Sequence, residues 1–178
     1  MRDEILVFAK SQIGQKEIKG NMGFVDPVFD MIMRRVGFED SQAWCALFAE
    51  ACYSFPTYEH KSKVFLTISD CFSANAVRTY DNFQKYGGEF FEVGKKLLTG
   101  SVVIWEKRTN GEPIKNDIWT VGHAGIVSEV HEDYFKSIEG NGNSSGGREG
   151  IEVVEMVRKY NYFDKDGLCL KGFITPLL

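Results

Sequence analysis

AWCALFAEACYSF, residues 43–55, is apolar on nearly every side and carries a single charged residue, Glu50. A helix that is hydrophobic all round its circumference is stable only where it is buried on all sides. We therefore predict that this segment forms a helix through the core of the protein, with Cys45 near its N-terminus. The remaining elements are expected to pack around this helix.

Further helices are predicted in the N-terminal half of the chain. Residues 3–12 have apolar side chains at helical spacing, which is typical of an amphipathic helix. Asp26 and Pro27 fit the N-cap and the first turn of a second helix. Asp70 is expected to cap another helix over residues 71–86, and the polar stretch before it is expected to be ordered rather than a linker.

The pattern changes from helical to extended after residue 88. Short segments rich in branched or aromatic residues then alternate with turn residues, as is typical of successive strands in an antiparallel sheet. The strand candidates are residues 101–105, 124–127, 134–138, 151–157 and 168–174. The predicted fold class is α+β, a single domain over residues 1–178 in which N-terminal helices pack on a C-terminal antiparallel β-sheet.

The composition argues against several classes of partner. The 178 residues carry a formal net charge of −4 and a pI near 5.5, which disfavours electrostatic binding to nucleic acid or to anionic membranes. The N-terminus has acidic residues where a signal peptide carries positive charge, and no membrane span is visible. We therefore expect no nucleic-acid partner, no membrane insertion, and synthesis in the cytoplasm without a signal peptide.

The four cysteines, at positions 45, 52, 71 and 169, have neither CxxC spacing nor paired histidines near them. This spacing does not predict a metal site, and no cofactor is expected. A hydrophobic content of 43% can build a core without disulfide bonds, so we expect free thiols in a reducing compartment.

Cys45, His123 and Glu139 together predict a cysteine hydrolase. A thiol attacks carbonyl groups as the thiolate, which the amide groups and dipole of a helix N-terminus stabilise. His123 lies between glycines at a predicted strand start and is the natural general base. Glu139, at the end of the next predicted strand, can orient the imidazole if the two strands pair antiparallel, and Asn141 competes for that role.

Each of these residues also has a purely structural interpretation. A lone cysteine in an apolar helix is usually a small buried hydrophobe, and Cys52 is expected to be one. Glu139 before a glycine fits a solvated strand end, and Asn141 fits ordinary turn chemistry in a glycine-rich loop over residues 141–147. The functional prediction therefore depends on the joint occurrence of the three residue types.

Four segments resemble the signature segments of CHAP domains, the cysteine, histidine-dependent amidohydrolase/peptidases. They are WCALF at 44–48, GSVVIW at 100–105, GHAGIV at 122–127 and IEGN at 138–141. The resemblance also includes the N-terminal helix, so it covers most of the chain up to about residue 157. It implies a papain-like α+β fold related to the NlpC-type peptidases. Ser101 is a departure, because an aspartate is common at that position in the family.

Carried over residue by residue, the resemblance implies that Cys45 is the nucleophile and that His123 is the general base and acid. It implies that Glu139 orients His123, and Asn141 matches a position that often supports the histidine or the substrate. Gln42, three residues before the nucleophile, is predicted as a second donor to the oxyanion.

Most CHAP domains cleave amide bonds in bacterial peptidoglycan, so the resemblance implies an N-acetylmuramoyl-L-alanine amidase or endopeptidase that works through a thioester. Trp44 and Gly122 are then expected to line the substrate groove. Action at the cell wall or in the periplasm fits a phage lysin released through a holin, or an effector delivered by a secretion machine, with any immunity partner left open. The alternatives are a non-catalytic wall-binding or assembly module with the same fold, and a cysteine amidase acting on a small cytosolic amide.

Overall fold

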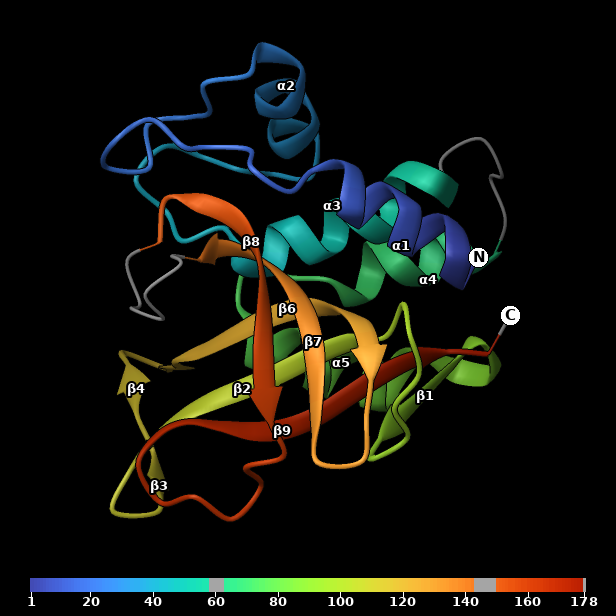
Figure 1. Ribbon diagram of the computed structural model, residues 1–178, viewed down its shortest axis with the longest axis vertical. Helices are drawn as coiled ribbons and strands as arrows, with labels where there is room; N and C mark the ends of the chain where they lie inside the picture. The colour runs from blue at the N-terminus through green and yellow to red at the C-terminus, as the bar shows by residue number, and fades with distance from the viewer. Residues whose placement is uncertain (58–62, 143–149, 178) are drawn as a thin grey trace.

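The computed structural model describes residues 1–57, 63–142 and 150–177, and over these ranges the protein is an α+β structure. Five N-terminal helices pack against a C-terminal antiparallel sheet of seven strands, as Figure 1 shows. The helices are α1 (Arg2–Ser11), α2 (Pro27–Arg35), α3 (Cys45–Thr57), α4 (Lys63–Cys71) and α5 (Ala76–Tyr86). The short 3-10 helix η1 (Gly88–Phe90) leads into the sheet.

The sheet has the strand order β1-β9-β2-β6-β7-β8, with β3 paired to β2. A separate two-stranded ribbon is formed by β4 and β5. The strands of the sheet are β1 (Phe91–Gly94), β2 (Val102–Thr109), β3 (Glu112–Pro113), β6 (Gly122–Val130), β7 (Tyr134–Gly142), β8 (Glu152–Lys159) and β9 (Gly167–Pro176), and those of the ribbon are β4 (Lys115–Asn116) and β5 (Trp119–Thr120). Of the neighbouring strands joined by the pairs β2–β6, β6–β7 and β7–β8, β6 and β7 lie against α3.

The core is divided by the sheet into two hydrophobic clusters. Val102 and Ile104 on β2 belong to the larger cluster, which lies between the helices and the sheet. Val103 and Trp105 belong to the smaller cluster, and since successive side chains of a strand point to opposite faces, it lies on the other face. The apolar helix α3 is buried in the larger cluster, as its sequence predicts.

A close approach between α3 and β7 depends on Gly140. A Cβ atom at this position would lie 2.5 Å from the ring of Trp44 and 2.7 Å from Cβ of Phe48. Both distances are far below an ordinary van der Waals contact, so a larger residue would push the helix off the strand. The glycine therefore lets the N-terminal turn of α3 lie directly against the strand that carries Glu139.

Several sequence predictions agree with these elements. The first two helices are confirmed, and the Asp26 side chain caps α2 by accepting a hydrogen bond from the backbone N–H of Val28. All five strand candidates are strands, each extended by a few residues. The short strands β1, β3, β4 and β5 were not predicted, because two to four residues are too few to show a periodic pattern.

The predicted helix over residues 71–86 is wrong at its N-terminal end. Asp70 lies inside α4, and the next helix begins only at Ala76, with Asn75 as its N-cap. The Asn75 side chain accepts a hydrogen bond from the backbone N–H of Arg78, so Asn75, and not Asp70, is the N-cap of this helix. The predicted loop over 141–147 falls mostly outside the described residues, and Asn141 belongs to the end of β7.

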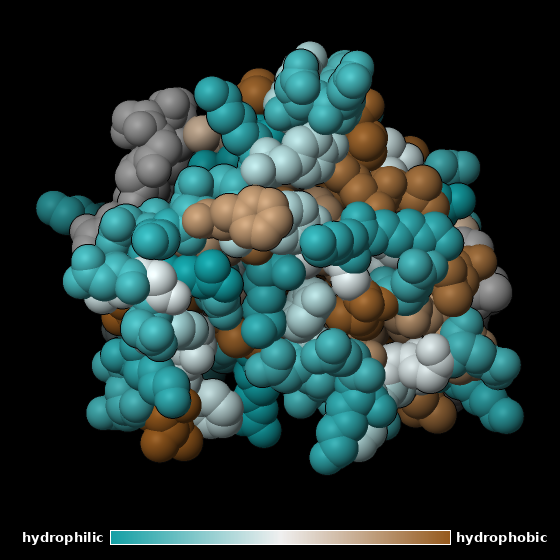
Figure 2. Space-filling model, turned by 90° about the horizontal axis from the view of Figure 1, so that it is seen from below, coloured by the Kyte–Doolittle hydropathy of each residue, from teal (hydrophilic) through white to brown (hydrophobic). Residues whose placement is uncertain are grey.

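Figure 2 shows one face of the molecule, on which hydrophilic residues predominate and hydrophobic residues are visible between them. Scattered apolar residues are normal on a folded domain and by themselves indicate no partner. Within the described ranges, none of the helices combines the length and the apolar character needed to cross a bilayer.

Candidate active site

Cys45 is the first residue of α3, and its thiol contacts the His123 ring at the start of β6. Burial alone would raise the pKa of this thiol. The charge and the hydrogen bond of His123, together with the backbone N–H groups of Ala124 and Ala46, outweigh burial and lower the pKa below its ordinary value. The geometry therefore favours a thiolate at the N-terminus of the core helix.

His123 lies between the thiol and a carboxylate. Its Nε2 atom is 2.8 Å from Oε2 of Glu139, so Nδ1 is the ring nitrogen available to Cys45. Burial would lower the pKa of the imidazole, but the Cys45 and Glu139 contacts raise it to about 10. Trp105, the β2 partner of His123, packs beside the ring at a centroid distance of 5.6 Å, with the two planes tilted by 31°. The ring is therefore fixed in direction and favoured in its protonated form.

Glu139 has no exposed surface and accepts four hydrogen bonds. Its Oε1 atom accepts from Ser137 Oγ at 2.6 Å and from Arg158 Nε at 2.7 Å. Its Oε2 atom accepts from Arg158 Nη2 and contacts His123. Burial opposes ionisation, but Arg158 and His123 bring the pKa of this carboxyl down to about 2.

The choice between Glu139 and Asn141 as the partner of His123 is decided by this contact. Asn141 lines the neighbouring cleft, with a left-handed backbone at φ 56°, but the carboxylate of Glu139 is the group bonded to the ring. Gly125 makes room for it, since a Cβ atom there would lie only 2.7 Å from Cγ of Glu139. The last glycine of the GHAG segment is therefore explained by the path of the glutamate side chain.

Arg158 on β8 is the functional-site residue that sequence reasoning missed. No motif marks it among the 21 lysine and arginine residues, and the predicted strand ended one residue before it. In the β7–β8 register Arg158 lies opposite Phe135 and Glu139 lies opposite Val154, so both side chains are on the same face of the sheet and the long arginine reaches the carboxylate. Only the pairing of the two strands could reveal this.

The three predicted catalytic residues open onto a cleft with a volume of about 250 Å³. Gly122, predicted to line a substrate groove, lies in the wall of this cleft. Its other walls are formed by Ala43, Lys107, Val121, Asn141, Gly142, Met156, Arg158, Gly167 and Leu168. Cys45 therefore borders a cleft whose walls include residues of β2, β6, β7, β8 and β9.

Two predicted site residues do not lie in this cleft. Trp44 is completely buried, with its ring among Phe24, Phe29 and Phe48 and its Nε1–H donating to Glu17 at 2.6 Å. Its assignment to the substrate groove is therefore wrong, because the side chain preceding the helix points into the core. Gln42 donates its side-chain N–H to the carbonyl of Gly37 at 3.0 Å, away from the described cleft lining. This geometry does not support an oxyanion contact from its side chain.

We expect iodoacetamide to modify Cys45 at least tenfold faster than the other three cysteines at about pH 7, because alkylation requires the thiolate. Burial raises the pKa of Cys52, Cys71 and Cys169, and that of Cys71 reaches about 11. Peptide mass spectrometry after a short labelling pulse measures the four rates in one sample. Equal, slow labelling at all four sites would contradict the lowered pKa of the Cys45 thiol.

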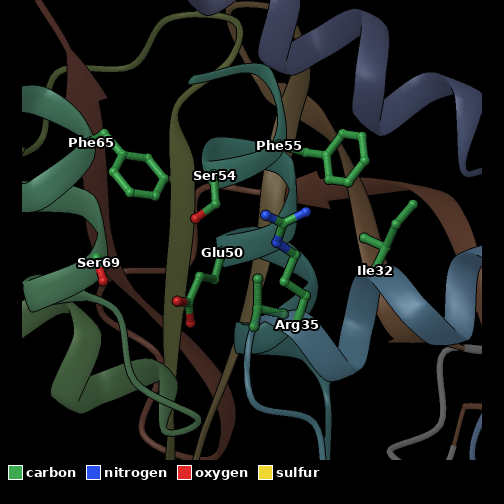
Figure 3. Close-up of a pocket in the computed structure, with 8 residues that line it drawn as sticks. Ile32, Arg35, Glu50, Ser54, Phe55, Phe65 and Ser69 are labelled. Atoms are coloured by element: carbon green, nitrogen blue, oxygen red, sulfur yellow. The ribbon is translucent and has the colours of Figure 1, made fainter. Parts of the chain in front are cut away.

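A second cavity lies among the helices, away from Cys45. Figure 3 shows side chains from α2, α3 and α4 around it. Its volume is about 390 Å³, and its described lining is formed by Ile32, Arg35, Val36, Glu50, Ser54, Phe55, Phe65 and Ser69. Burial raises the pKa of Glu50 to about 7. The one charged residue of the core helix is thus held beside this cavity at a cost in stability.

That cost predicts a pH-dependent effect of Glu50→Gln. A carboxyl whose pKa is raised on folding destabilises the folded state as pH rises through the interval from about 4.5 to about 7. At about pH 8 the variant should therefore be more stable than the wild type by about 2–3 kcal/mol, which corresponds to roughly 5 °C or more in Tm. At about pH 4.5 the difference should vanish.

Thermal melts of both proteins at the two pH values measure the effect. Glu132→Gln, at an exposed position, is the control and should change Tm little at either pH. A Glu50→Gln variant that melts at the wild-type temperature at about pH 8 would show that the carboxyl is not strained by burial.

The described residues contain no group of three or more His, Cys, Asp or Glu side chains placed to hold a metal ion. All four cysteines are free and buried. The candidate site brings together a thiol, an imidazole and a carboxylate. Comparison of the chain with protein families, with curated proteins and with solved structures gives no match in any of the three.

Proposed function

We propose that this protein is a cysteine hydrolase of amide bonds, with a papain-like arrangement of its site and with bacterial peptidoglycan as its substrate. The observation that carries the proposal is the continuous contact from Cys45 through His123 to Glu139 at the mouth of a cleft. A nucleophile, a base and a group that orients the base are the three parts that such chemistry needs.

In the proposed mechanism the Cys45 thiolate attacks the amide carbonyl carbon, and a tetrahedral oxyanion forms. The backbone N–H of Cys45, the first residue of α3, is the donor that we propose stabilises it. The His123 imidazolium then gives its proton to the amine, which leaves as the C–N bond breaks and a thioester remains. Water, deprotonated by His123, attacks the thioester and releases the acid and the thiolate. One amide and one water thus become one acid and one amine.

Glu139 supports both steps. It stays ionised and bonded to Nε2, so the ring keeps Nδ1 directed at the thiol and carries its positive charge at low energetic cost. Peptidoglycan as the substrate is supported by the four CHAP-like segments, three of which contribute residues at or beside the cleft: the start of α3, the start of β6 and the end of β7. The fourth forms β2, the strand beside β6.

Mass spectrometry of purified peptidoglycan after incubation with the protein tests the proposal. New muropeptide or stem-peptide fragments are expected, and their masses identify the cleaved bond. Walls of several chemotypes are needed, because cross-bridges differ between them. If no wall is cut while Cys45 is selectively alkylated, the substrate is a small amide instead. If Cys45 is also unreactive, the protein is a binding module rather than an enzyme.

A further inference from the structure

We propose that Arg158 is a positioning residue of this site, which fixes the Glu139 carboxylate on His123 and keeps it ionised in acid. The inference rests on the proposed function, because it assumes that Cys45 is a reactive nucleophile. It concerns the pH below which Cys45 no longer reacts as a thiolate paired with His123.

The first argument is geometric. Arg158 donates from Nε to one carboxylate oxygen of Glu139 and from Nη2 to the other. A planar guanidinium that spans both oxygens of a carboxylate fixes its plane as well as its position. Ser137 adds a third donor, at Oε1, and His123 occupies the remaining hydrogen-bonding position at Oε2. The carboxylate is therefore held in the orientation in which it meets the imidazole.

The second argument is that Arg158 is itself held in place. Its guanidinium carbon lies 5.2 Å from the centroid of the Trp105 ring, a cation–π contact. The same tryptophan packs against His123 in a tilted arrangement. Arg158, Glu139, His123 and Trp105 thus form a closed circuit of contacts from β8, β7, β6 and β2. A displacement of Arg158 would therefore disturb both Glu139 and Trp105, the two residues that hold the imidazole.

The third argument is electrostatic. The charged or titratable groups around the carboxylate are Arg158 from β8, His123 from β6, Cys45 behind the imidazole from α3, and Lys107 from β2 in the cleft wall. A carboxylate without exposed surface tends to take up a proton unless cations face it. The guanidinium stays charged throughout the accessible pH range, whereas the imidazolium exists only while the site is protonated. Arg158 is therefore the permanent partner of Glu139.

Loss of Arg158 has a defined consequence. Glu139 becomes protonated at a higher pH, the imidazolium loses its counter-ion, and the thiolate becomes less favourable in the same pH range. The readout is the rate of Cys45 alkylation by iodoacetamide as a function of pH, measured on the whole protein. We expect the acid limb of the profile for Arg158→Gln to move up by about one pH unit, a roughly tenfold lower rate between about pH 4 and 5.

Two further variants complete the experiment. Arg158→Lys keeps the charge but loses the two-point contact, so a smaller upward shift is expected. Arg108→Gln is the matched control, because Arg108 is a strand arginine that binds a buried glutamate, Glu106, outside the described cleft lining. Its profile should coincide with that of the wild type.

The outcomes separate the two proposals. If Cys45 of the wild type reacts no faster than the other cysteines, the proposed function fails. If it reacts selectively and the profiles of the folded Arg158 variants coincide with the wild type, the role of Arg158 is wrong while the proposed function stands. Should Arg158→Gln not fold, Arg158→Lys decides: a shifted limb supports the role, and a wild-type profile overturns it.

Discussion

Peptidoglycan incubated with the Cys45→Ala variant should release no new fragments, a loss of at least roughly a thousandfold relative to the wild type. The methyl group cannot attack a carbonyl, and no other described thiol lies in the cleft. The fold should persist, because the substitution removes one sulfur atom and is expected to cost only about 1 kcal/mol. Parallel digests analysed by mass spectrometry, with thermal melts of both proteins, measure activity and stability.

Cys52→Ala is the matched control for this experiment. Cys52 lies seven residues further along the same helix, is completely buried, and packs in the larger hydrophobic cluster. Its replacement should lower Tm slightly through the small cavity it leaves and should leave wall cleavage intact. Fragments released by purified Cys45→Ala would contradict the thiol mechanism. Loss of cleavage in a folded Cys52→Ala would show that helix packing rather than the nucleophile controls the assay.

Glu139→Gln should reduce kcat by about 10⁴-fold, the loss expected when a catalytic histidine loses its orienting carboxylate to an amide. The amide offers one acceptor oxygen and one NH₂ group, whereas Arg158 donates to both carboxylate oxygens of the wild type. In either orientation of the amide, an N–H of Arg158 therefore faces the NH₂ group, and the partly buried guanidinium loses its counter-charge. Removing one partner of such an ion pair is destabilising, so stability also falls.

Glu106→Gln separates the catalytic loss from the loss of stability. Glu106 is also buried and bonded to a strand arginine, Arg108, but it does not contact His123. Both variants should melt at lower temperatures than the wild type, while only Glu139→Gln should lose cleavage when both are assayed well below their Tm. If the two variants lose activity to the same degree, Glu139 contributes to folding alone.

The helical half of the fold follows closely from local sequence, because apolar spacing and capping residues act over a few positions. The apolar segment at 43–55 becomes the buried α3, and Asp26 caps α2 as predicted. The break between α4 and α5 was missed because Asp70 and Asn75 are both good capping residues. The choice between them depends on contacts such as that of Ser73 N–H with Thr79 Oγ1, which no pattern displays.

The candidate site divides in the same way. Cys45, His123 and Glu139 are recognisable in the sequence because each stands in a short local setting: a helix start, a glycine pair, a strand end. Trp44 was misassigned for a related reason, since adjacency to the nucleophile in sequence says nothing about the direction of the side chain. The structure directs its ring into the core and its N–H to Glu17.

By itself the sequence determined that helices precede a sheet of at least five strands, that the core helix is buried, and which three residue types the candidate site contains. Only the tertiary structure decided that Glu139 rather than Asn141 meets the imidazole, and that Arg158 holds Glu139 from the strand beyond. The physical reason is that helix and strand patterns depend on residues close together in the chain, whereas the hydrogen-bond partners of a buried carboxylate lie on neighbouring strands. Its ionisation depends on donors 16 and 19 residues away, which only the register of the sheet brings within reach.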